Sequence, residues 1–121
     1  MLMTVRTTKR VVAAAFSLAA WSAMALPAAA QDEAKIKRGQ EVYAAQKCQM
    51  CHAIAGKGNK ANPLDGVGAK LSDDDIRQWI THPTEMSAKA KSTKKPPMPN
   101  KYANLAAADL DALVAYLQSL K

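Results

Sequence analysis

The chain has 121 residues, with 17 lysines and arginines against 10 acidic residues, and a formal net charge of +7. This length predicts one small domain and excludes a set of independent cores. The chain has only two cysteines, which are too few for a scaffold held together by several disulfides.

Residues 1–30 have the three-part pattern of a cleavable secretory signal peptide. Three basic residues precede an apolar run, residues 11–25, and a segment of small residues ends at Ala30. The apolar run is shorter than the ~20 residues that span a bilayer, which disfavours an uncleaved membrane anchor. We therefore expect cleavage after Ala30, a mature domain of residues 31–121 without a membrane span, and a periplasmic location.

Two helices are predicted at the ends of the mature domain. The first extends from Asp32 to about Cys48, and Gly39 within it suggests that another element approaches closely. The last extends from Ala106 to Leu120 and carries one stripe of apolar residues at helical spacing.

A third helix is predicted between them. Ser72 and Asp75 have the spacing of a capping box, and His82-Pro83 ends the helix because a residue before proline avoids the helical region. The connecting segments, 53–71 and 84–104, show no apolar periodicity, and no segment alternates like a strand. The predicted fold class is therefore all-α, with three main helices joined by long loops.

The segment Cys48-Gln49-Met50-Cys51-His52 gathers both cysteines and one of the two histidines of the chain. A redox dithiol would be expected in a βαβ context, which is missing here. A zinc site needs four ligands, and only the distant His82 would remain as the fourth. The interpretation left is covalent attachment of haem, for which C-x-x-C-H is the known motif.

The spacing of this motif suits haem. Thiols three residues apart project from one face of a helical turn, so Cys48 and Cys51 can both reach the vinyl groups along one porphyrin edge. The imidazole of His52 then binds the iron from the proximal side.

The chain resembles the class I, mitochondrial-type monohaem cytochromes c of the small bacterial periplasmic kind, over residues 35–120. Besides the C-x-x-C-H motif, the matching features are Gly39 and Tyr43, Pro63, and the late "PPMP" segment. The resemblance implies the cytochrome c fold, with long loops wrapped around one covalently attached haem c. It also implies a one-electron carrier rather than an enzyme. One departure is Ala106, where the family commonly has a capping serine, threonine or aspartate.

The distal ligand of the iron separates a carrier from an open-site haem protein. Met98 lies between prolines, which fix the backbone and can hold a sulfur at a set distance, and the resemblance makes it the axial ligand. Met86 and His82 are the alternatives, whereas Met50 lies between the attachment cysteines and cannot reach the far face.

Further roles follow from the resemblance. The carbonyl of Pro63 would accept the second ring N–H of His52. Trp79 and Tyr102 would hydrogen-bond haem propionates, with plain core packing as the alternative for each. Gly39 and Tyr43 would pack against the last helix. Its facing residues would be Leu113, Tyr116 and Leu117.

The mature chain is basic around the expected haem edge. Exposed lysines there would attract acidic redox partners, namely the electron donor and acceptor, although a solvated lysine-rich loop is the alternative. These lysines are Lys57, Lys60, Lys89, Lys91, Lys94, Lys95 and Lys101. No aromatic residues interleave with them, so nucleic acid is not expected as a partner, and we expect a monomer.

Two further functional classes stay open. The chain would also fit the cytochrome subunit of a periplasmic dehydrogenase or oxidase complex. A haem enzyme or gas-binding protein would require an open distal site, without Met98 on the iron.

Overall fold

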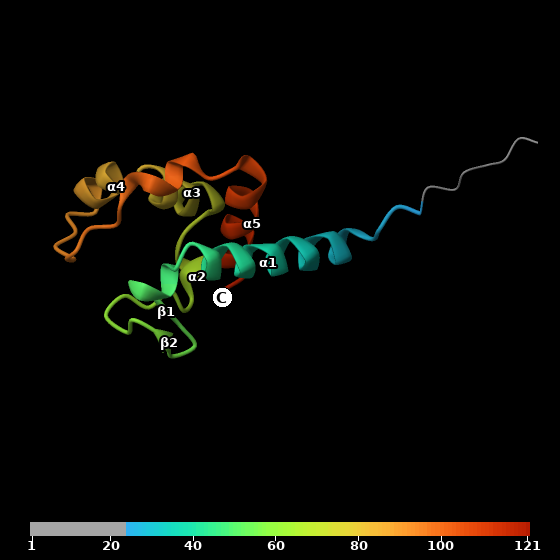
Figure 1. The fold of residues 1–121 in the computed structure, drawn as a ribbon, viewed down its shortest axis with the longest axis horizontal. Coiled ribbons are helices and arrows are strands. Elements are labelled where there is room, and N and C mark those ends of the chain that lie inside the picture. Colours follow the sequence, from blue (N-terminus) through green and yellow to red (C-terminus); the bar gives the residue numbers. More distant parts are fainter. Residues whose placement is uncertain (1–23) are drawn as a thin grey trace, which may run out of the picture.

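The computed structural model describes residues 24–121 and consists mainly of helices (Figure 1). The three longest are α1 (Ala28–Ala45), α3 (Asp73–Thr81) and α5 (Ala107–Gln118). The all-α prediction with three main helices is confirmed. The shorter elements are α2 (Val67–Lys70), α4 (Pro83–Lys89), the 3-10 helices η1 (Cys48–Met50) and η2 (Asn100–Asn104), and the strands β1 (Ala53–Ile54) and β2 (Lys57–Gly58).

Helices α1 and α5 cross at a buried glycine, as the sequence predicted. A β-carbon on Gly39 would overlap the backbone carbonyl of Ala112 and lie 2.5 Å from Cβ of Tyr116. One turn further along α1, the rings of Tyr43 and Tyr116 meet edge to face, with centroids 5.8 Å apart. The absence of a side chain at Gly39 thus lets the two backbones approach directly.

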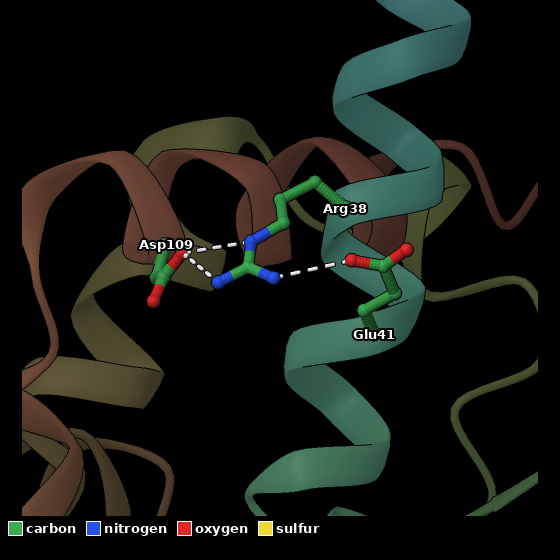
Figure 2. Close-up of polar contacts among 3 residues, drawn as sticks. All are labelled: Arg38, Glu41 and Asp109. Carbon is green, nitrogen blue, oxygen red and sulfur yellow. Dashed lines mark hydrogen bonds and ion pairs between the residues drawn. The ribbon is translucent and has the colours of Figure 1, made fainter.

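An ion-pair cluster joins the same two helices near the start of α5 (Figure 2). The guanidinium of Arg38 on α1 bonds Oδ1 of Asp109 through Nη2 at 2.9 Å and Nε at 3.0 Å. It also bonds Oε2 of Glu41 at 3.1 Å. Ala106 at the N-cap of α5 provides no side-chain hydrogen bond. The ion pair from Arg38 attaches the side chain of Asp109, in the first turn of α5, to α1.

The apolar core lies where α1, α3 and α5 meet. Its buried members are Val42, Ile76, Ile80, Tyr102, Leu113, Val114 and Leu117. Within residues 24–121, no helix is long and apolar enough to cross a membrane.

Helix α3 begins as predicted but continues differently. Asp75 donates its backbone N–H to Oγ of Ser72 at 3.1 Å, and its carboxylate accepts from the Ser72 backbone at 3.4 Å, which confirms the capping box. Pro83 ends α3 and also begins α4, because proline fits the first turn of a helix, where its missing N–H has no partner to lose. The expectation that residues 84–104 lack helix is therefore wrong for α4 and η2.

The loop after the C-x-x-C-H motif contains a small hairpin, so the expectation of no strand is also wrong. Ala53 pairs with Gly58 and Ile54 with Lys57, antiparallel. The turn between them uses Ala55 and Gly56, with φ of 50° and 76°. Two-residue strands are too short to show the alternation by which strands are predicted.

The first helix differs from its predicted bounds at both ends. It begins at Ala28 because a run of alanines follows Pro27, and alanine is the best helix former. It ends at Ala45, and Cys48 starts η1 instead of closing α1. Most of the predicted signal peptide lies outside the described residues, so its cleavage stays a prediction.

Candidate functional site

The C-x-x-C-H segment forms a tight turn directly after α1. Lys47 has the left-handed backbone conformation, with φ of 56°, and redirects the chain into η1. The backbone N–H groups of Cys51 and His52 both bond the carbonyl of Cys48, at 3.1 and 2.9 Å. This turn brings Cys48, Cys51 and His52 to the wall of one cavity.

That cavity has a volume of about 350 Å³ and lies between the motif and the proline-rich segment of Met98. A second, almost wholly apolar cavity of about 200 Å³ adjoins it on the core side. The combined space is in the range of sites for sizeable ligands. The residues that line both are Cys48, His52, Leu64, Trp79, Met98 and Tyr102.

The ring of His52 is oriented by a backbone carbonyl. Its Nδ1 lies 3.1 Å from the carbonyl oxygen of Asn62, which accepts the ring N–H and leaves Nε2 for a metal. Burial lowers the pKa of His52 and the Asn62 contact opposes this. The net shift favours the neutral imidazole, which is the form that binds iron.

The prediction that the Pro63 carbonyl accepts from His52 is wrong, because the acceptor is the Asn62 carbonyl. Pro63 forms a parallel bridge with Ala53, in which Asn62 O accepts from Ala53 N at 3.3 Å and Leu64 N donates to Ala53 O at 2.8 Å. Successive carbonyls of an extended segment point in opposite directions, so the Asn62 carbonyl faces the motif and that of Pro63 does not. Pro63 itself lies on the cavity wall.

The structure brings Met98 into the same space as His52. Met98 is half-buried, lines both cavities and packs against the core. The alternatives do not share this position. Met86 and His82 line neither cavity, and Nδ1 of the exposed His82 lies 2.8 Å from Oγ1 of Thr81. Met50 points to solvent, with 68% of its surface exposed.

Trp79 on α3 and Tyr102 on η2 both line the two cavities. Tyr102 is also a buried member of the core, so this residue both packs in the core and lines the cavities. Burial raises the pKa of the Tyr102 phenol, which keeps it a hydrogen-bond donor.

Burial also affects the first attachment cysteine. It raises the pKa of the Cys48 thiol to about 11. Cys51, in contrast, lies exposed at the surface.

Besides Asn62, Leu64 and Tyr43 contribute to the site without a sequence-based role there. Leu64 lines both cavities, but a single leucine in a loop rich in glycine gives no periodic signal. Tyr43 was predicted only to pack on the last helix. Its hydroxyl also donates to the carbonyl of His52, at 3.5 Å, so it supports the motif from α1.

The family model for cytochrome c matches residues 36–121. The chain belongs to the cytochrome c family. It is also 29% identical over 98 residues to cytochrome c oxidase subunit 2 of Alkalihalophilus pseudofirmus, covering 74% of this chain. The chain spans only about a quarter, 27%, of that relative's length. No solved structure matches the chain.

Membership in this family means that the cytochrome binds haem c covalently, with iron at its centre. The residues present fit the group, because two thiols, one imidazole held by a backbone carbonyl and one thioether all border the same apolar space. Haem iron, when bound, supplies one-electron chemistry. The cytochrome c domain therefore implies haem-based electron transfer.

Proposed function

We propose that this cytochrome is a periplasmic one-electron carrier in which His52 and Met98 are the two axial ligands of the iron. The observation that supports this most is that both side chains line the same cavities as Cys48. A thioether opposite an imidazole closes the iron and favours the ferrous state, which raises the reduction potential. A closed iron suits a carrier and not a catalyst that must bind a substrate.

The residues of the chain would hold the two ligands in place during electron transfer. The Asn62 carbonyl fixes the tautomer and the rotation of the His52 ring. Pro96, Pro97 and Pro99 restrict the backbone around Met98. Restricted ligands move little when the iron changes its charge, and this keeps electron exchange fast.

The lining of the cavity also includes polar groups. Trp79 and Tyr102 would donate hydrogen bonds to the propionates of the haem, since each lines the cavity and carries an N–H or O–H donor. The two cysteines would form the thioether bonds to the porphyrin.

Acidic redox proteins are the proposed donor and acceptor. Lys94 lines the larger cavity and is exposed. The other lysines expected around the haem edge are exposed as well: Lys57, Lys60, Lys89, Lys91, Lys95 and Lys101. Their positive charge would speed association with an acidic surface, in a salt-dependent manner. Electron transfer to an acidic partner should therefore slow steeply as ionic strength rises, whereas an unchanged rate would contradict this docking surface.

The proposed ligation is tested with an absorption spectrum of the dithionite-reduced protein, before and after adding carbon monoxide. A sharp α band that does not respond to the gas supports a closed, six-coordinate iron. A shift of the Soret band on adding the gas would mean an open or labile distal side, and a gas-binding or enzymatic function would then be favoured.

A second candidate function is supported by one observation, the 29% identity to an oxidase subunit. The cytochrome would then pass electrons as a part of an oxidase complex. Gel filtration of a native extract, followed by haem absorbance, distinguishes the two. Elution near the 13.0 kDa of the chain, or below it after signal cleavage, supports the free carrier. Elution together with oxidase activity supports the subunit.

A further inference from the structure

The segment that carries Met98 has few backbone attachments to the rest of the protein. In the described part of the chain, the backbone of residues 93–98 forms no backbone–backbone hydrogen bond. Pro96 and Pro97 have no N–H to donate. The position of this loop must therefore depend on side-chain contacts and on the packing of Met98 against the core.

Lys94 provides a polar contact from this loop to the opposite lip of the cavity. Its Nζ donates to the carbonyl oxygen of Ala61 at 3.1 Å, although the two residues are 33 positions apart. Both residues line the larger cavity. Figure 1 shows the loop after α4 and the loop after β2 on the same side of the molecule, and the Lys94 contact joins them.

The acceptor of this bond is next to the residue that orients the proximal histidine. Ala61 precedes Asn62, whose carbonyl accepts from His52 Nδ1. The far end of the Met98 segment has a different anchor, where Oγ1 of Thr84 donates to Oδ1 of Asn100 at 3.1 Å. Among the described residues, the Lys94 bond is thus the one hydrogen bond between the distal loop, residues 90–99 with Met98, and the proximal loop, residues 59–66.

We infer that Lys94 is a positioning residue that latches the Met98 loop to the proximal loop and limits how readily Met98 leaves the iron. The inference rests on the proposed function, in which Met98 is the distal ligand. Because the bond is exposed to solvent, its effect is modest and appears as a change in ligand exchange rather than in folding. The latch requires a side chain at position 94 that donates a hydrogen bond to the Ala61 carbonyl.

The test is the rate at which imidazole replaces Met98 in the ferric holoprotein, measured by stopped-flow absorbance at saturating imidazole. The form of imidazole that binds iron is the neutral one, so a change of charge on the loop does not bias its entry. Lys94→Ala should speed the exchange about five-fold, which corresponds to the loss of one hydrogen bond worth ~1 kcal/mol. Lys94→Arg keeps a cationic donor and should restore the wild-type rate.

Lys95→Ala is the matched control, because it removes the same charge from the neighbouring exposed residue. It should leave the rate within about two-fold of wild type, since the latch bond remains. Equal rates for Lys94→Ala and Lys95→Ala would overturn the inference and leave only a charge effect. An unchanged rate in Lys94→Ala would also overturn it.

Met98→Ala separates failure of the latch from failure of the proposed ligation. If Met98→Ala opens the iron and Lys94→Ala has no effect, only the latch is wrong. If Met98→Ala leaves imidazole binding unchanged, the ligand assignment fails. The latch is then judged by backbone order parameters at Lys95 and Met98 in the reduced protein, which should fall in Lys94→Ala but not in a Lys89→Ala control. Unchanged order parameters would overturn it.

Discussion

Gly39 and Ala112 lie in direct backbone contact where α1 crosses α5. A β-carbon at Gly39 would overlap the Ala112 carbonyl, and that group belongs to the middle of a helix and cannot rotate away. The α1–α5 crossing also positions Tyr43, whose hydroxyl bonds the His52 carbonyl. The packing at Gly39 therefore influences the haem motif as well as the core.

We predict that Gly39→Ala lowers the free energy of unfolding by ~2–3 kcal/mol, because the helices must separate to admit the methyl group. In an open helix the same change would raise stability by ~1 kcal/mol, so the sign identifies the cause. Urea denaturation of the holoprotein measures it. Gln40→Ala, at the neighbouring exposed position on α1, is the control and should change stability little. A Gly39→Ala variant as stable as wild type would contradict the close contact.

The two helix N-termini offer a paired prediction. Ser72 caps α3 with a hydrogen bond to Asp75 N, so Ser72→Ala should cost ~1 kcal/mol of stability. Ala106 holds the N-cap position of α5 with an extended backbone, φ −55° and ψ 141°, but has no side-chain acceptor. Ala106→Ser should therefore stabilise the protein by ~1 kcal/mol.

Urea midpoints of both variants, measured against wild type, check the pair. The essential outcome is that the free energy of unfolding falls in Ser72→Ala and rises in Ala106→Ser. If Ala106→Ser did not stabilise the protein, a serine hydroxyl at this position would not accept from the backbone N–H groups of the first turn of α5.

Patterns with strong local causes could be predicted from the sequence. The capping box needs only Ser72 and Asp75 at the right spacing, and it forms in the structure. Gly39 in an otherwise helical stretch predicted a close approach, and α5 provides it. The C-x-x-C-H motif predicted the haem family because few other chemistries need that pattern.

The predictions that were wrong depended on tertiary geometry, which cannot be inferred from a single sequence. The sequence predicts that Pro83 ends a helix, but the same residue also starts α4, and local rules allow both. The acceptor for His52 is Asn62 and not Pro63, because a parallel bridge with Ala53 decides which carbonyl faces the ring. The Lys94 bond to Ala61 joins distant loops and has no local signal.

Alkaline pH provides a further prediction, at Tyr43. Burial raises the pKa of its phenol to about 12 from the ordinary value of 10.0. Between these two values the unfolded chain loses this proton and the folded protein keeps it. The stability due to the neutral phenol is thus fully present below pH 10 and is lost as the pH rises toward 12.

Tyr43→Phe should therefore lose less stability than wild type between about pH 8 and about pH 11. Urea midpoints at the two pH values, followed by far-ultraviolet circular dichroism, give the difference. The variant also lacks the hydroxyl bond to His52, which lowers its stability at both pH values alike. The change with pH is consequently the decisive quantity, and equal changes in the two proteins would contradict the raised pKa of the partly buried phenol.

The final prediction concerns the distal ligand. Met98→Ala should open the iron to external ligands such as carbon monoxide in the reduced protein, because Met98 lines both cavities beside His52. It should also lower the reduction potential, since the thioether that favours the ferrous iron is lost. Spectra with the gas and a redox titration measure these two effects.

Met86→Ala is the matched control for this variant. Met86 is a half-buried methionine of α4 that lines neither cavity, so its removal should leave the iron closed and the potential near that of wild type. The reverse pattern, with an open iron only in Met86→Ala, would move the ligand to α4 and would require the Met98 loop to leave the cavity. Closed iron in both variants would instead mean that a different side chain completes the coordination.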